Sequence, residues 1–319
     1  MYKLNYLRSI VAMSVTLLLV SGSVYARDIP AVQNPLLWRI NTSPPSWLFG
    51  TIHLPDERVT TLPAAVRNSF DQSKAFYAEV PMDSRMQLRV TLGMLRNDQK
   101  MLTDVLPRKT FTRLQQRLKK IEPKLSAGLF IGMKTWVVMM SLVLLENQSK
   151  HPQNKPLDLT LYLLAKQDGK RVGGVESVEQ QLGYLDQFSE QEQLDMLENT
   201  LQQMDKAEKE HTTISEIMIQ WYLKGDVENT PRMIEKFPMS QDPALQQRAV
   251  KSLITGRNKT MANSIAEILR LHPGESHFFA LGAAHLGGGN SVQSHLQELG
   301  LETERYPSVS NTAAGQHQR

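Results

Sequence analysis

The sequence predicts an α/β fold, with a central mixed β-sheet and a large helical lobe. Short apolar segments, bounded by Gly, Pro or Asn, recur along the 319 residues and are separated by helical stretches. From Ser84 to Glu146, Gly and Pro are sparse and apolar residues recur every three or four positions, which indicates helices. We interpret residues 27–306 as one α/β domain with helical insertions at about 84–170 and 189–272.

The individual elements follow from local composition and from Gly and Pro punctuation. The expected strands are 36–40, 47–51, 75–80, 170–176, the apolar run that begins at Phe278, and 301–306. Outside the block 84–146, the expected helices are 62–70, 157–166, 189–223, two helices within 242–271 that are split at 256–258, and 291–299. Together these elements alternate between strand and helix, as an α/β sheet requires.

The segment from Gly128 to Leu145 is the most apolar part of the helical block 84–146 and is long enough to raise the question of a membrane span. Lys134 lies inside it, and helical sequence typical of soluble proteins flanks it. We therefore expect a buried core helix, in which Met133, Met139 and Met140 fill gaps in the core.

The N-terminus has the pattern of a secretion signal. Lys3 and Arg8 precede an apolar stretch from Ile10 to Val20, and Val24-Tyr25-Ala26 forms a small-x-small cleavage site. We predict cleavage after Ala26, which would place the mature protein outside the cell or, in a Gram-negative source, in the periplasm. The small, polar residues 307–319 are expected to form a disordered tail.

The composition excludes several function classes. Because the chain has no cysteine, disulfides, thiolate metal sites and cysteine nucleophiles are absent. Its formal net charge is +4, and removing residues 1–26 leaves 34 basic and 32 acidic residues, so nucleic acid is not an expected partner. The motifs of α/β serine hydrolases, helix-borne zinc proteases and P-loop proteins do not occur.

Four expected strand ends each carry one group that could do chemistry. Gly50-x-x-His53 and Gly282-x-x-His285 follow two strands in the same way, and Glu79 and Glu176 follow two others. A single histidine after a strand is more often structural, but two in matching contexts with two carboxylates favour a shared site. Neutral imidazoles and carboxylates are ligands for Zn, Mn, Fe or Co, and a carboxylate that does not bind the ion could be a general base.

Five sequence blocks carry a family resemblance: LFGTIHLPD (48–56), FYAEV (76–80), VGGVESVEQQ (172–181), RNKTMANSIAEIL (257–269) and FFALGAAHLGGGNSVQSHLQELG (278–300). Together they resemble the TraB/GumN family, which is related to the TIKI metalloproteases and more distantly to erythromycin esterases and ChaN haem-binding proteins. The resemblance implies an α/β core like that of the erythromycin esterases and ChaN proteins. It also implies a site built from both histidines and both glutamates.

The resemblance assigns further residues with less weight. Arg257 and Asn258 match an Arg-Asn block of the family, and such an arginine could stabilise a developing oxyanion. Asp158 matches an aspartate that opens a helix, for which we expect a structural role. The substrate, peptide or small molecule, and the oligomeric state stay open.

Several functions are therefore compatible with the sequence. The first is a secreted metal-dependent hydrolase, a peptidase, with His53, His285, Glu79 and Glu176 around a divalent ion and Arg257 beside it. The second is a metal-independent, esterase-like hydrolase that uses a His–Glu pair. The third is a non-catalytic protein that binds haem or a peptide. A membrane role through the apolar segment is a minor fourth.

Overall fold

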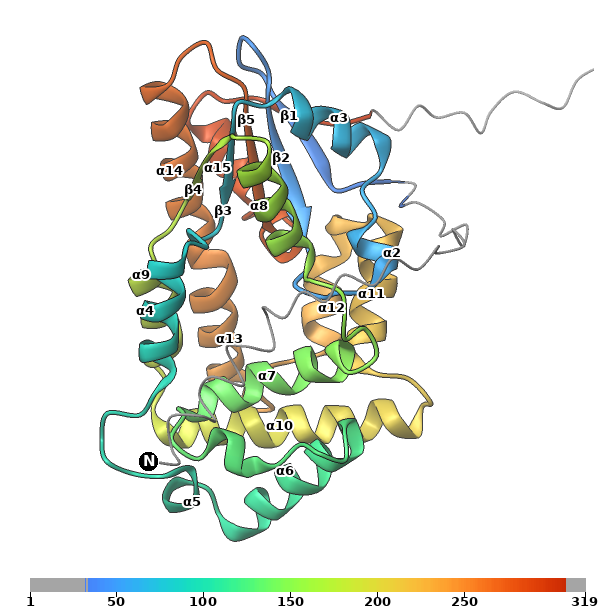
Figure 1. Ribbon diagram of the computed structural model, residues 1–319, viewed down its shortest axis with the longest axis vertical. Helices are drawn as coiled ribbons and strands as arrows, with labels where there is room; N and C mark the ends of the chain where they lie inside the picture. The colour runs from blue at the N-terminus through green and yellow to red at the C-terminus, as the bar shows by residue number, and fades with distance from the viewer. Residues whose placement is uncertain (1–31, 33, 308–319) are drawn as a thin grey trace, which may run out of the picture.

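The computed structural model describes residue 32 and residues 34–307. The predicted signal peptide lies outside these residues, as does all but the first residue of the predicted tail. A six-stranded mixed sheet forms the centre of the upper part of Figure 1, and helices surround it. The α/β fold with a helical lobe is therefore confirmed.

The sheet has the strand order β4-β3-β5-β2-β1-β6. Its strands are β1 (Leu37–Ile40), β2 (Ser46–Thr51), β3 (Ala75–Ala78), β4 (Arg171–Gly174), β5 (His277–Gly282) and β6 (Thr303–Arg305). The neighbours β4, β3, β5 and β2 run parallel, whereas β1 pairs antiparallel with both β2 and β6. The carboxyl ends of four strands that lie far apart in the sequence therefore meet at one edge.

The inner strands are apolar almost throughout because helices cover both faces of the sheet. All six residues of β2 are buried, as are the first five of β5. Phe278 of β5 contacts Phe49, Phe70 and Phe76, with ring centroids 5.4 to 6.4 Å apart. This aromatic cluster fixes β2, β3 and β5 against one another.

The helices divide between the sheet and a separate lobe. Those packed near the sheet are α2 (Glu57–Thr60), α3 (Ala64–Gln72), α8 (Leu157–Gln167), α14 (Gly256–Leu271) and α15 (Val292–Glu298). The lobe and its connections contain α4 (Ser84–Met94), α5 (Leu102–Val105), α6 (Arg108–Ile121), α7 (Thr135–Gln148), α9 (Val178–Asp186), α10 (Glu190–Lys209), α11 (Ile214–Lys224), α12 (Thr230–Lys236) and α13 (Pro243–Val250). The lobe has its own apolar core, centred on α6, α7 and α10, at the end of the molecule away from the sheet (Figure 1).

Two expectations about the apolar segment 128–145 were wrong in detail. The segment is not one helix, because a short 3-10 helix (Ala127–Phe130) ends before α7 begins at Thr135. Met139 is buried, but Met140 is 48% exposed, so it does not fill the core. No helix among the described residues is long and apolar enough to span a membrane.

Two further corrections concern helix boundaries. The expected helix 189–223 is two helices, α10 and α11, because the chain turns at His211, which has a φ of 56°. The expected split at 256–258 does not occur. Instead, a π-helical turn (Lys251–Thr255) continues from α13 directly into α14. Such turns are frequent at functional sites, and this one ends two residues before Arg257.

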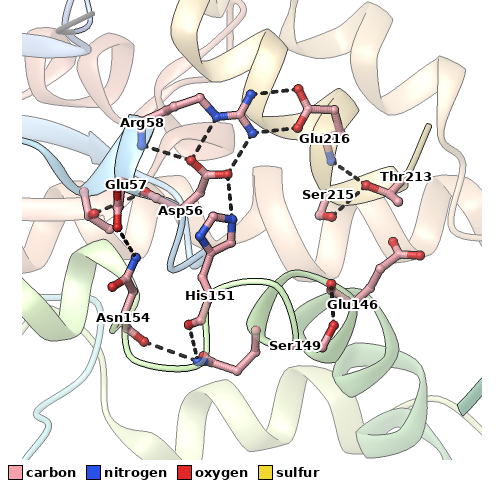
Figure 2. Close-up of polar contacts among 12 residues, drawn as sticks. Asp56, Glu57, Arg58, Glu146, Ser149, His151, Asn154, Thr213, Ser215 and Glu216 are labelled. Atoms are coloured by element: carbon pink, nitrogen blue, oxygen red, sulfur yellow. Dashed lines mark hydrogen bonds and ion pairs between the residues drawn. The ribbon is translucent and has the colours of Figure 1, made fainter. Parts of the chain in front are cut away.

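A polar cluster connects the segment after β2 to the lobe (Figure 2). The Arg58 guanidinium donates hydrogen bonds to Asp56, at the start of α2, and to both carboxylate oxygens of Glu216 in α11. His151, between α7 and α8, has its Nε2 atom 3.2 Å from Asp56 Oδ2. Asp56 is buried, so these contacts fix the chain just beyond His53 to two parts of the lobe.

Candidate active site

The carboxyl edge of the parallel strands brings the predicted site residues together. Glu79 directly follows β3 and Glu176 lies two residues after β4, while His53 and His285 follow β2 and β5. Arg257 reaches the same edge from the first turn of α14. All of these side chains except His53 are buried. Their convergence agrees with the sequence analysis, and their chemical roles stay predictions.

Arg257 joins the two glutamates. Its Nη2 atom donates to Glu79 Oε2 and to Glu176 Oε2, each at 2.5 Å, and its Nε atom lies 3.2 Å from both Glu176 oxygens. Burial lowers the pKa of Arg257, but its hydrogen bonds and ion pairs with Glu176 and Glu79 outweigh burial and raise it. The guanidinium therefore stays charged and compensates two buried carboxylates. Its other Nη group donates to the Leu253 carbonyl, at the π-helical turn.

Glu79 has one oxygen on Arg257 and the other on the strand that carries His285. Its Oε1 atom accepts a hydrogen bond from the Gly282 N–H group at 2.7 Å and lies 3.9 Å from His285 Nε2. Burial would raise the pKa of Glu79, but His285, Arg257, His53 and the Gly282 N–H group together lower it. Glu79 is thus a carboxylate at neutral pH.

His285 is oriented by Asn258. Its Nδ1 atom lies 2.7 Å from Asn258 Oδ1, while the Asn258 amide nitrogen donates to the Asn290 carbonyl at 2.5 Å. This arrangement makes Nδ1 the protonated nitrogen of a neutral ring and leaves the Nε2 lone pair facing Glu79. Burial, together with the charges of Arg257 and His53, lowers the pKa of His285 to about 4 although Glu79 opposes the shift. His285 is neutral at pH 7.

His53 is oriented by Asp158, which lies in the first turn of α8. The His53 Nδ1 atom is 3.1 Å from Asp158 Oδ1, and the His53 side chain is 53% exposed. Asp158 raises the pKa of His53 to about 9, against a smaller opposing effect of burial. Sequence reasoning expected only a structural role for Asp158, and the structure places it against one of the two site histidines.

Both imidazoles approach the same point beside Gly282. A Cβ atom at Gly282 would lie 2.9 Å from Glu79 Oε1, 3.6 Å from His285 Cδ2 and 3.9 Å from His53 Nε2. Side chains that follow three strands therefore surround this glycine closely, so a side chain at this position would displace the Glu79 carboxylate. The Gly50 counterpart has a different reason, since a Cβ there would lie 2.8 Å from Leu36 Cβ in the core.

These donors match a divalent metal ion in chemical type. The Nδ1 atom of each imidazole lies beside an oxygen, at 3.1 Å from Asp158 Oδ1 for His53 and at 2.7 Å from Asn258 Oδ1 for His285. Such outer partners are typical of metal-binding histidines. The 3.9 Å between His285 Nε2 and Glu79 Oε1 is within the span of two ligands that each lie about 2.1 Å from one ion. Within residues 34–307, no three His, Asp or Glu side chains already stand at ligand spacing. Ligation by His53, His285 and Glu79 would thus need small side-chain adjustments.

Two residues of the site were not singled out from the sequence. Gln181, in α9, donates to Glu79 Oε2 at 2.8 Å and to Glu176 Oε2 at 3.3 Å. Tyr184, one turn later, has its ring centroid 5.6 Å from the Arg257 guanidinium carbon. Both lie just after the Glu176 strand, so the block 172–181 contained a signal for Gln181 but none for Tyr184.

Fold and site together define an α/β protein with two histidines and two arginine-bound glutamates at the carboxyl edge of a parallel sheet. The chain belongs to the TraB/PrgY/gumN family, whose model matches residues 36–305. The family resemblance inferred from the five sequence blocks is therefore confirmed.

Curated relatives of the chain are named as metalloproteases. "Metalloprotease TIKI homolog" of Nematostella vectensis is 27% identical over 314 residues, which cover 85% of this chain and 67% of the relative. "Metalloprotease TIKI2" of Danio rerio is 28% identical over 86% of this chain and 61% of its own length. "Metalloprotease TIKI1" of Homo sapiens is 27% identical over 86% and 62%. The chain thus spans about three fifths to two thirds of these relatives. No solved structure gives a significant match.

Proposed function

We propose that this protein is a metal-dependent hydrolase, a peptidase, that is exported after cleavage near Ala26. The observation that carries the proposal is the convergence of His53 Nε2, His285 and Glu79 Oε1 beside Gly282. The names of the relatives support a peptidase activity. The metal would be Mn, Co, Zn or Fe, because imidazole and carboxylate ligands suit these ions.

In this proposal, His53, His285 and Glu79 hold the ion. A divalent ion supplies a Lewis acid that polarises a carbonyl and lowers the pKa of water toward about 7. Asp158 and Asn258 lie beside Nδ1 of the two imidazoles, which leaves Nε2 as the ligating atom of each ring. The Nε2 atom of His285 is unprotonated at pH 7, whereas His53, whose pKa is raised to about 9, would lose its Nε2 proton when the ion binds. These contacts give the chain two histidines that are already oriented.

The two glutamates have different surroundings, which suggests different roles. Glu79 Oε1 faces the common point, whereas both Glu176 oxygens face Arg257. We assign ligation to Glu79 and positioning of Arg257 to Glu176. The hydrogen bonds of Arg257 use four of its five N–H groups, so one Nη1 hydrogen is left for an oxygen of the substrate, such as a developing oxyanion.

The direct test measures the metal and the activity in parallel. The native protein, purified without chelators, is analysed for Mn, Co, Zn and Fe by mass spectrometry and assayed against a fluorogenic peptide library. We expect stoichiometric metal, peptide cleavage that chelators abolish, and loss of both in His53→Ala and His285→Ala. His272→Ala, near the other end of β5, is the matched control. Unchanged metal content in both site variants would exclude the proposed ligand set.

A metal-independent hydrolase is the second candidate, and the His53–Asp158 pair favours it. A histidine with a carboxylate beside Nδ1 is the usual arrangement of a general base that activates water. Because the pKa of His53 is raised to about 9, this base is mostly protonated at pH 7, and the activity should increase as the pH rises toward 9. This mechanism predicts peptide or ester hydrolysis that survives prolonged treatment with a strong chelator but is lost in Asp158→Asn. The chelator therefore separates the two candidates on the same preparation.

A further inference from the structure

The helical lobe contains a groove far from the sheet edge. It lies along α6 and α10, at the lower end of Figure 1, and has a volume of about 960 Å³. Its walls are Arg108, Lys109, Thr112, Arg113, Gln116, Arg117 and Lys120 of α6, and Asp205, Glu208 and Lys209 of α10. None of these residues takes part in the candidate active site, so the groove needs an explanation of its own.

The groove concentrates positive charge. It is lined by six cationic side chains and two carboxylates, although the formal net charge of the whole chain is only +4. The sequence of α6, RKTFTRLQQRLKKI, contains no acidic residue. One face of this helix buries Leu114 and Leu118 in the lobe core, which leaves the basic residues on the groove side and toward solvent.

The two carboxylates of the groove hold some of its cationic side chains in place. Asp205 accepts hydrogen bonds from Arg113 and Arg117, and Glu208 accepts from Arg117 and Lys120. The Arg117 side chain is only 6% exposed, so its guanidinium is held in place at the floor of the groove. Fixed arginines of this kind bind carboxylates or phosphates with little loss of side-chain freedom.

Three cations at the groove keep their charge uncompensated. Among the described residues, no acidic side chain lies within ion-pair distance of Arg108, Lys109 or Lys209. All three are exposed. The excess charge is therefore available to a ligand that enters from solvent.

The shape of the groove indicates the kind of ligand. Lys109 and Lys120 are eleven residues apart on one helix, which corresponds to about 16 Å along its axis. An extended peptide of about five residues has this length. A concave site lined by separated cations suits a narrow chain that carries separated negative charges better than a flat membrane surface.

We propose that the groove between α6 and α10 binds a short acidic segment of a protein partner, with Arg108, Lys109 and Lys209 pairing its carboxylates. Arg113 and Arg117 contribute fixed donors at the floor. This inference does not depend on the proposed hydrolase chemistry, because it concerns binding at a separate place in the molecule.

Fluorescence anisotropy with the full mature chain tests this proposal. The probes are a labelled hexaglutamate peptide and its hexaglutamine counterpart. Arg108→Glu/Lys109→Glu reverses two groove charges, and both positions are exposed at the start of α6, where acidic residues favour helix formation. The matched control is Lys119→Glu/Lys124→Glu, which changes the net charge equally at exposed positions that do not line the groove.

We expect hexaglutamate to bind more tightly than hexaglutamine, with an affinity that falls as salt is added. The groove variant should weaken hexaglutamate binding about tenfold or more, and the control variant should change it about twofold or less. Thermal unfolding verifies that both variants fold. Equal weakening in the two variants would show that only net charge matters and would overturn the proposal. So would binding to phosphatidylglycerol vesicles, sensitive to the same groove variant, without binding to hexaglutamate.

Discussion

Replacing Arg257 with methionine removes the only positive charge in hydrogen-bond contact with Glu79 and Glu176 among the described residues. The Glu176 side chain is fully buried and that of Glu79 is 10% exposed, so water does not replace the lost partner. Breaking a buried ion pair by removing one partner costs about 3–5 kcal/mol. We therefore expect Arg257→Met to lower the free energy of unfolding at pH 7 by this amount, which is a large fraction of the stability of a typical domain.

Urea unfolding in the presence of a chelator, followed by far-UV circular dichroism, measures this loss. The control is Arg248→Met, since the Arg248 side chain is 56% exposed in its pair with Glu192 and such exposed pairs contribute about 0–1 kcal/mol. In Arg257→Met/Glu176→Gln one of the two buried charges is gone, so part of the stability should return. A loss below about 1 kcal/mol in Arg257→Met would refute the reasoning that this arginine compensates buried carboxylates.

The difference in the free energy of unfolding between Arg257→Met and the native protein depends on pH in a defined way. In the native protein the pKa of Glu79 lies below its usual value of 4.5, so the stabilisation from this carboxylate is complete above that pH and is lost only in stronger acid. Without Arg257, Glu79 keeps its burial and loses one favourable charge, which raises its pKa. The stability of the variant should therefore increase relative to the native protein as the pH falls from 7 toward 4.

Three further predictions concern the site and the lobe. Gly282→Ala fits the backbone, with φ −54° and ψ 131°, but places a methyl group 2.9 Å from Glu79 Oε1. We expect this variant to fold and to lose peptide cleavage by at least about 100-fold. The control Gly183→Ala, where a Cβ meets no atom within 4 Å, should retain activity. Asn258→Ala removes the partner of His285 Nδ1 and should weaken Co²⁺ binding, followed by visible absorption, about 10- to 100-fold; unchanged affinity would contradict the proposed orientation of this ring. Burial raises the pKa of Glu146, and its Oε2 atom has no hydrogen-bond partner. Glu146→Gln should therefore raise the free energy of unfolding by about 1 kcal/mol at pH 7 and leave it unchanged near pH 4. A variant that is destabilised at pH 7 would show that the carboxylate is compensated.

The sheet edge was accessible to sequence reasoning because its signals are local. An apolar run that ends in Gly-x-x-His reveals both a strand and the side chain at its exit, and parallel strands bring such ends together. His53, Glu79, Glu176 and His285 were therefore found without knowing the strand order. The pairing among them could not be predicted from the sequence. That Arg257 contacts both glutamates depends on how α14 packs against the sheet, and no local pattern encodes this.

Apolar periodicity was less informative in the lobe. It found that helices were present, but the exposure of each residue depends on which helices pack together. Met140 lies among buried neighbours in the sequence and yet is exposed, because α7 is covered on part of its circumference only. The break at His211 was missed because a non-glycine residue with positive φ leaves no clear mark in the sequence. Asp158 appeared to be a helix-start residue, and its contact with His53 became visible only in three dimensions.

Helices α4 and α9, which lie side by side in Figure 1, come shortly after Glu79 and Glu176, respectively. At their contact, a Cβ on Gly93 would lie 2.3 Å from Leu182 Cδ1, and no residue of α4 is fully buried. The pair is tightly joined at this contact, and α9 is also tied to α7, because Asp186 accepts hydrogen bonds from Trp136 and Lys134. Both glutamates accept hydrogen bonds from Gln181 of α9, whereas the imidazoles follow β2 and β5 and have partners in α8 and α14. Helix α14 connects these two halves of the site, because its adjacent residues Arg257 and Asn258 contact the glutamates and His285, respectively.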